Sequence, residues 1–253
     1  MRLQIEVVTS ATELPWSSVL APGRSLAYDL LSRMARGLGQ RLHDDGWGPH
    51  RMTPFGHSAP IFPNAPRVPG RYAAGGHGSV EFGSPVPDIV EAWAAGVRQR
   101  ELIDWGGVAL RITRVSAIDP PDFSSGIARM RTATPVVMKG SGRNEDGERT
   151  TRQAFLFPQD AEFPAYFDQN LRRKMETLGL DAKVALERVT WVGAKRSFSV
   201  GKGGKPGMPI EVELRGDQEG LQAIWSWGLG QSNPAGFGWV AAEDRVAAEG
   251  KAG

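Results

Sequence analysis

The sequence predicts an α+β fold made of two consecutive units, each with the order strand, helix, strand, strand, helix, strand. Two observations support this. Short segments alternate apolar and polar residues, as strands with one buried face do. Between them, apolar residues recur at the spacing of one helical face. The 253 residues suffice for two domains of roughly 100–150 residues each.

The first unit has the ferredoxin-like element order, and we assign it residues 1–118. A break is expected in its first helix at Gly37 and Gly39, because glycine lowers helix stability. The expected elements are a strand at 3–8, a helix at 25–42, strand fragments within 50–78, a strand at 79–82, a helix at 85–97 and a strand at 108–115.

The second unit follows the same order less cleanly and is assigned residues 126–243, with a flexible tail at 244–253. A central cleft is expected between the two ferredoxin-like domains. No close internal sequence repeat accompanies the repeated element order. The expected elements are strands at 131–139 and 150–157, a helix at 163–180, strands at 185–200 and 209–215, a helix at 217–228 and a closing strand at 237–241.

The composition excludes several classes of protein. At 40% hydrophobic and 23% charged residues, it is that of an ordinary globular chain. The absence of cysteine excludes disulfides, thiolate metal sites and cysteine nucleophiles. No apolar run is long enough for a signal peptide or for the roughly 20 residues of a membrane span. We therefore expect a cytoplasmic protein.

A basic segment, "KRSFSVGKGGK" at 195–205, contains cations around Phe198 and no acid. Cations with an aromatic residue suit a polyanion that also stacks, such as a nucleic acid. The simpler alternative is a solvated hairpin with Gly203 and Gly204 at its tip. The cations are Lys195, Arg196, Lys202 and Lys205.

The most distinctive stretch is "GLGQSNPAGFGWV", residues 228–240. It contains no lysine, so it is not a P-loop, and it follows a predicted helix, which is the reverse of a dinucleotide-binding loop. One interpretation is a helix C-cap at Gly228 followed by a tight entry into the last strand. The other is a loop whose backbone amides come close to phosphate groups, because glycine has no Cβ.

At this place in the chain the loop resembles the C-terminal signature of the CRISPR-associated repeat-RNA endoribonucleases, which belong to the repeat-associated mysterious protein (RAMP) superfamily. "MRLQIEVV", "LAYDLLSRMARGLGQRLHDDGW" and "ATPVVM" are also similar to segments of that family. The signature alone does not separate active nucleases from inactive RNA-binding relatives. The matching residues are Gly228, Leu229, Gly230, Gly236, Phe237, Gly238 and Val240.

The residue types favour cleavage without a metal or cofactor. There is no H-E-x-x-H motif, and the nearest acidic group, His43-Asp44-Asp45, is of a kind that is usually solvated. RNA supplies its own nucleophile, the 2′-hydroxyl beside the scissile phosphate. Histidine suits proton transfer near neutral pH, and tyrosine, with an ordinary pKa near 10, suits orienting the hydroxyl.

The resemblance implies that His43 transfers protons and that Tyr28 assists. On one unbroken helix these residues would be roughly 22 Å apart, but the expected break could bring them together. The plain alternatives are a turn histidine and a packing tyrosine. A lysine that the family places beyond the histidine has no match, and "GWGPHRM" offers His50 and Arg51 instead.

The expected function is cleavage of CRISPR precursor RNA within its repeats, leaving a 2′,3′-cyclic phosphate and a 5′-hydroxyl. One alternative is a non-catalytic RNA-binding or scaffold subunit, and another is a metal-dependent phosphoesterase. The expected partners are repeat RNA and other subunits of an effector complex, with the protein a monomer or homodimer. Phe237 is expected in the core more than in base stacking. Besides the catalytic candidates His43, Tyr28 and His50, the residues expected at RNA are Arg51, Arg129, Arg131, Lys195, Arg196, Lys202, Gly228, Gly230, Gly236, Phe237 and Gly238.

Overall fold

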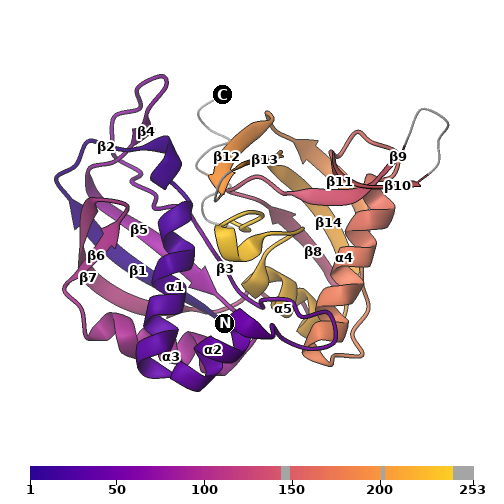
Figure 1. Ribbon diagram of the computed structural model, residues 1–253, viewed down its shortest axis with the longest axis horizontal. Coiled ribbons are helices and arrows are strands. Elements are labelled where there is room, and N and C mark those ends of the chain that lie inside the picture. The colour runs from indigo at the N-terminus through magenta and orange to yellow at the C-terminus, as the bar shows by residue number, and fades with distance from the viewer. Residues whose placement is uncertain (144–148, 201–202, 242–253) are drawn as a thin grey trace.

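The computed structural model describes residues 1–143, 149–200 and 203–241, and it is a mixed α+β structure of two lobes (Figure 1). One hydrophobic core is drawn from residues between Leu3 and Leu110, and a second from residues between Phe123 and Val240. A third, small cluster joins residues of both lobes, such as Leu20 and Phe237. No helix of the described ranges is long and apolar enough to cross a membrane. The tail expected at 244–253 lies outside these ranges.

The N-terminal lobe is built on a five-stranded sheet in the order β3-β5-β1-β7-β6, with antiparallel neighbours throughout. The alternating residues of the first strand, Leu3, Ile5 and Val7, are buried in the core of this lobe. The elements are β1 (Arg2–Thr9), β2 (Glu13–Leu14), η1 (Trp16–Ser18), α1 (Ala21–Met34), α2 (Arg36–Asp44), β3 (Gly56–His57), β4 (Tyr72–Ala73), β5 (Gly76–Gly83), α3 (Pro87–Arg98), β6 (Leu102–Trp105) and β7 (Val108–Ile118).

The first helix is broken, but at a different residue from the one expected. The chain leaves helical geometry at Ala35, with φ −148° and ψ 60°, so that α1 ends at Met34. Both glycines lie within α2, because a glycine in a helix only lowers its stability. Gly39 has a different effect: a Cβ there would lie 3.1 Å from Cβ of Leu31, so the glycine lets α2 pack closely on α1.

The C-terminal lobe contains a three-stranded sheet in the order β11-β14-β8 and two hairpins, β9–β10 and β12–β13. One face of the lobe carries α4, and α5 lies between the lobes near the centre of the molecule (Figure 1). The elements are β8 (Ile127–Arg131), β9 (Met138–Arg143), β10 (Arg149–Leu156), α4 (Phe163–Leu178), β11 (Val184–Val192), β12 (Arg196–Val200), β13 (Gly203–Gly207), β14 (Ile210–Gly216), α5 (Gln218–Trp227) and η2 (Asn233–Ala235).

Three predicted strands of this lobe are shorter than expected. The segments 131–139 and 185–200 each divide into parts of two strands, β8 with β9 and β11 with β12. The closing strand at 237–241 is reduced to a single bridge between Thr132 and Val240. Gly236 and Gly238 have φ values of +83° and +65°, which a regular strand does not allow.

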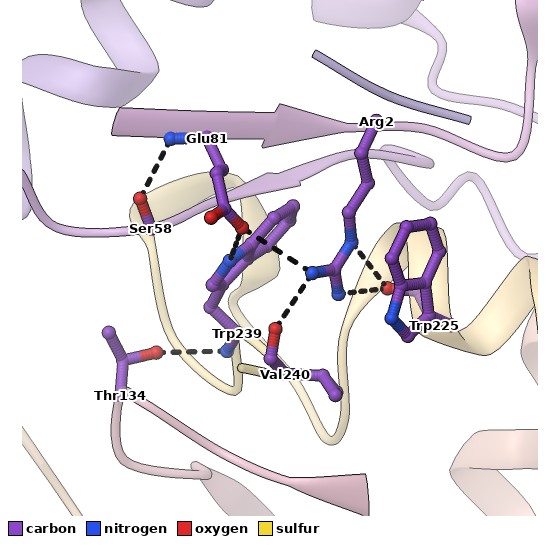
Figure 2. Close-up of polar contacts among 7 residues, drawn as sticks. All are labelled: Arg2, Ser58, Glu81, Thr134, Trp225, Trp239 and Val240. Atoms are coloured by element: carbon purple, nitrogen blue, oxygen red, sulfur yellow. Dashed lines mark hydrogen bonds and ion pairs between the residues drawn. The ribbon is translucent and has the colours of Figure 1, made fainter. Parts of the chain in front are cut away.

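The two lobes are joined by a buried arginine near the start of β1 (Figure 2). Arg2 is fully buried, and its guanidinium lies 3.9 Å from the ring centre of Trp225 and 4.0 Å from that of Trp239. It donates a 2.8 Å hydrogen bond to the carbonyl of Val240 and lies 3.5 Å from the carboxylate of Glu81. Glu81 also accepts a 3.1 Å bond from the indole of Trp239. These contacts fix the C-terminal segment against the N-terminal sheet.

Candidate functional site

The helix break brings Tyr28 of α1 and His43 of α2 together, an arrangement that the sequence allowed without requiring it. Their ring centres are 5.6 Å apart, with the planes at 79°. Tyr28 is half-buried and also meets Phe55 edge-on at 5.5 Å, so its ring is fixed by the core. The His43 side chain is 66% exposed and therefore open to a large ligand. Both residues stand on neighbouring helices, which hold them more rigidly than a loop would.

The imidazole of His43 has a carboxylate beside it. Its Nδ1 lies 3.0 Å from Oδ1 of Asp44, and in the neutral tautomer that has its proton on Nδ1 it donates to this oxygen. Arg51 donates from Nε to the carbonyl of Asp45 at 2.8 Å and from Nη2 to that of Asp44 at 3.1 Å. The end of α2 is thereby held in place. An exposed imidazole oriented by an acid, with a phenol beside it, can carry out general acid–base chemistry.

His50 occupies a different position, in the loop that crosses from α2 to the C-terminal lobe (Figure 1). Its Nε2 forms a short contact with Glu176 near the end of α4. The loop lies directly on that helix end, since a Cβ at Gly48 would be 2.3 Å from the carbonyl of Thr177. The structure thus pairs His50 with an acid of the other lobe and does not group it with Tyr28 and His43.

The glycine-rich loop is buried, and the protein itself surrounds it. The amides of Gly228, Gly236 and Gly238 donate to protein carbonyls at 2.7–2.8 Å. Gly230 and Gly238 both have φ +65°, and a Cβ at Gly238 would lie only 1.9 Å from the carbonyl of Leu229. The expectation that free glycine amides face phosphate therefore does not apply to the three whose donors are taken, and these glycines serve the fold.

A buried lysine holds this loop from the C-terminal lobe. Nζ of Lys174 donates to the carbonyl of Gly228 at 2.5 Å and to Oδ1 of Asn233 at 2.8 Å. The amide of Asn233 donates in turn to the carbonyls of Leu229 and Phe237, both at 2.9 Å. Burial holds the pKa of Lys174 well below its usual range. Nothing in the sequence relates Lys174 to Asn233, although a lysine within the apolar stripe of the helix at 163–178 is a signal of a buried amine.

His57 connects the loop to the N-terminal lobe. The ring is fully buried, and its Nδ1 lies 2.9 Å from the carbonyl of Ser58. A Cβ at Gly23 would come within 2.3 Å of this ring, and one at Gly236 within 2.7 Å, so the ring fits between two glycines. Burial lowers the pKa of His57 to about 4. It is a packed interior histidine, which the sequence could not distinguish from an RNA contact.

The basic segment forms the β12–β13 hairpin, with Lys195 and Arg196 exposed at its start. Lys202 lies outside the described residues. Phe198 is only 8% exposed and meets Phe237 edge-on at 6.2 Å, so it cannot act as a stacking platform. Phe237, at 1% exposure, belongs to the core and not to the RNA-contacting residues. The hairpin therefore offers cations without a free aromatic ring.

The two arginines of β8 have protein partners on the outer face of the C-terminal sheet. Arg129 forms an ion pair with Glu211, with N–O distances of 2.8 and 2.5 Å. The guanidinium of Arg131 lies 4.3 Å from the ring centre of Trp191, a residue 40% exposed. Of these two arginines, Arg131 is the one that presents its charge beside an exposed aromatic ring. Among the described residues, no group of three histidines, cysteines or acids is placed to hold a metal ion.

Comparison with solved structures agrees with this architecture. One similar chain is described as "An RAMP protein binding different RNA substrates" (TM-score 0.76, 17% identity, covering 95% of this chain and 98% of that one). A Cas6-related protein from Pyrococcus furiosus matches with a TM-score of 0.76 and 16% identity over 96% of this chain and 99% of that one. A chain described as CRISPR associated protein Cas6 matches with a TM-score of 0.74 and 20% identity over 95% and 98%. At these identities the likeness shows the fold.

The fold is thus of the class found in RAMP proteins. Residues 118–242 match the family model described as CRISPR associated protein Cas6, C-terminal, and the chain belongs to the Cas6 family of CRISPR-associated proteins. No curated protein matches the sequence.

Proposed function

We propose that this protein is a metal-independent endoribonuclease that cleaves CRISPR precursor RNA within its repeats. The observation that carries the proposal is the Tyr28–His43 pair, in which an exposed imidazole lies beside a phenol and an orienting carboxylate. The 2′-oxygen forms a bond to phosphorus while the bond from phosphorus to the 5′-oxygen breaks. The 2′-hydroxyl loses its proton to a base, and the leaving 5′-oxygen gains one from an acid. The products are a 2′,3′-cyclic phosphate and a 5′-hydroxyl.

In this proposal His43 transfers a proton and Tyr28 orients the reacting hydroxyl. His50 is the candidate for the second proton transfer, and it can act there only if its contact with Glu176 opens when RNA binds. Arg51 supports the site by holding the carbonyl end of α2. No cofactor takes part in these steps.

We further propose that the lobes are two ferredoxin-like domains, residues 1–118 and 126–243, with RNA bound along the cleft between them. The sheet order β3-β5-β1-β7 is the one expected for such a domain, and β11-β14-β8 with the Val240 bridge follows the same order. Lys195, Arg196, Lys202 and Arg131 are the proposed RNA-binding cations. A structurally similar RAMP protein is described as binding RNA, which supports RNA as the ligand. The proposed setting is the cytoplasm, as a monomer or homodimer, alone or within an effector complex.

The decisive experiment uses repeat RNA in EDTA, with and without a 2′-deoxy substitution at the nucleotide before the scissile phosphate. We expect cleavage of the natural RNA in EDTA, no cleavage of the substituted RNA, and nearly equal affinity for both, since one hydroxyl contributes little beside many backbone contacts. A deoxy substitution one nucleotide away is the control and should be cleaved.

Cleavage of the analogue at the usual position would show that water or a protein group attacks. Loss of activity in EDTA would show a metal-dependent phosphoesterase. Tight binding of natural repeat RNA with no cleavage would show the alternative, a non-catalytic RNA-binding subunit.

A further inference from the structure

Trp16, the first residue of η1, keeps a large aromatic surface open to solvent. It is 45% exposed, and Trp191 is the other aromatic residue among the large apolar side chains exposed in the described ranges. One face of Trp191 is covered by the guanidinium of Arg131. No cation lies over the ring of Trp16 in the part of the chain that the structure describes. The Trp16 ring can therefore receive another flat ring.

The exposed ring is nevertheless held in one orientation. The indole N–H of Trp16 donates a 2.8 Å hydrogen bond to the carbonyl of Gly70. The ring of Tyr72 meets it edge-on, with the ring centres 5.6 Å apart and the planes at 84°. Tyr72 is itself fixed, because its hydroxyl donates to the carbonyl of Pro60 at 2.9 Å. A ring that is fixed before a ligand arrives loses little conformational freedom on binding.

The Trp16 ring lies where the two lobes meet. Its centre is 6.1 Å from that of Phe198 on β12, with the planes at 51°. Phe198 in turn packs against Phe237 of the glycine-rich loop at 6.2 Å. Trp16 is thus the exposed end of a row of aromatic rings that begins in the buried loop. The row draws on both lobes, and the β12–β13 hairpin lies on the side of the C-terminal lobe that faces the N-terminal lobe (Figure 1).

The hairpin places positive charge around this ring. Lys205 of β13 is the cross-strand partner of Phe198, and Arg196 precedes Phe198 by two residues on β12. All three side chains therefore point to the same face of the hairpin. Arg196 is exposed and Lys205 is half-buried, and residues 195–207 contain no acid. A flat aromatic ring beside cations suits a nucleobase and its phosphates, whereas a protein partner is better matched by mixed charges.

We propose that Trp16 is a stacking platform for one unpaired base of the repeat RNA, with Arg196 and Lys205 binding the phosphates beside that base. This proposal rests on the proposed function, since it takes repeat RNA as the ligand. The hairpin has no free ring of its own because Phe198 is buried, and the N-terminal lobe supplies one.

The position of Trp16 separates this base from the reacting nucleotide. Trp16 precedes α1, whereas Tyr28 lies about 10 Å along the axis of that helix from its start. The stacked base must also be unpaired, because a base within a duplex already stacks on its neighbours. The site therefore selects RNA by the presence of a single-stranded nucleotide at a set distance from the cut, and it acts on affinity.

The first test measures affinity for repeat RNA that carries the 2′-deoxy substitution described above, so that binding is observed without cleavage. Stacking one base on an aromatic ring changes affinity by about 5- to 150-fold. We expect a loss in this range for Trp16→Leu, which removes the flat ring, and a smaller loss for Trp16→Phe, which keeps one. Leu102→Ala, at an exposed apolar residue of β6, is the control and should bind as the wild type does. Wild-type affinity in Trp16→Leu would overturn the proposal and leave the ring as a surface for a protein partner.

The second test removes bases from the RNA. Unpaired nucleotides of the repeat are replaced one at a time by abasic nucleotides, which keep the phosphates and lack the ring. We expect one position at which this change weakens binding to the wild type but not to Trp16→Leu, because the two partners of one contact are coupled. Equal losses for both proteins at every position would overturn the stacking site. If the wild-type protein cleaves no RNA but shows this coupling, the proposed nuclease function fails and the stacking site stands.

Discussion

The Tyr28–His43 pair and the glycine-rich loop are constructed in opposite ways. The pair is local, since it depends on two neighbouring helices of one lobe and leaves the imidazole exposed. The loop is buried and depends on side chains from both lobes, with Lys174 on one side and His57 on the other. The loop carries the sequence that identifies the family, whereas the pair carries the proposed chemistry. A recognisable motif can therefore owe its composition to packing alone.

Replacing His43 should slow cleavage and leave the fold intact. General acid–base catalysis contributes about 10²–10⁴-fold, or roughly 3–5 kcal/mol in the barrier. We expect His43→Ala to lower the cleavage rate by that factor, with unchanged melting temperature and nearly unchanged affinity for repeat RNA. Single-turnover kinetics and a binding titration measure these quantities. A variant that retains more than about a third of the wild-type rate would remove His43 from the mechanism, because even the low end of the stated range is a larger loss.

A substitution in the glycine-rich loop should have the opposite effect, because it should lower the stability of the fold. At Gly238 a side chain would meet the carbonyl of Leu229 at 1.9 Å in a left-handed backbone. Overpacking and strain each cost roughly 1–3 kcal/mol, so we expect Gly238→Val to lower the free energy of unfolding by several kcal/mol, as measured by urea denaturation.

The matched control is Gly37→Ala in α2, where a Cβ meets nothing within 4 Å. It should raise stability by about 0.5–1 kcal/mol, because alanine is the better helix former. Equal stability of wild type and Gly238→Val would mean that the loop is a simple connector whose glycines are not required by packing.

The pH dependence of stability sharpens the contrast between buried His57 and exposed His43. The folded state binds a proton at His57 only near pH 4, whereas the unfolded chain binds it near the ordinary value of 6.5. Between these values the unfolded state holds more protons, so stability falls as the pH decreases from 6.5 to 4, by about 3 kcal/mol. Urea denaturation across this range should show the loss. The same slope in His57→Gln would assign it to other groups.

The smallest effect is expected at the basic hairpin. Lys195 and Arg196 are exposed and stand outside the buried loop. Reversing both charges should weaken binding of repeat RNA about tenfold and flatten the salt dependence, because each phosphate contact adds to the slope. The double reversal should leave the melting temperature unchanged. If affinity and salt slope both persist, the segment is a solvated hairpin with no role in binding.

The sequence predicted the local features of the fold well. Periodicity located the helices, and the expected break placed Tyr28 beside His43, although Ala35 and not a glycine makes the turn. It could not predict contacts between distant segments. Lys174 and His57, the side chains that pack against the glycine-rich loop, are far from that loop in the sequence. Neither periodicity nor composition relates these two residues to the loop.

The contacts of Arg2 have a consequence for how the chain folds. Its carbonyl partner at Val240 is 238 positions away. The stacking of Arg2 between Trp225 and Trp239 is therefore complete only when almost the whole polypeptide is present. Contacts of such long sequence separation form late and slowly in folding. A chain interrupted before Trp239 would leave Arg2 and Glu81, both buried, without the indole of Trp239 and would leave Arg2 without the carbonyl of Val240. Only a polypeptide that reaches Val240 can therefore form all the contacts that hold the two lobes together at Arg2.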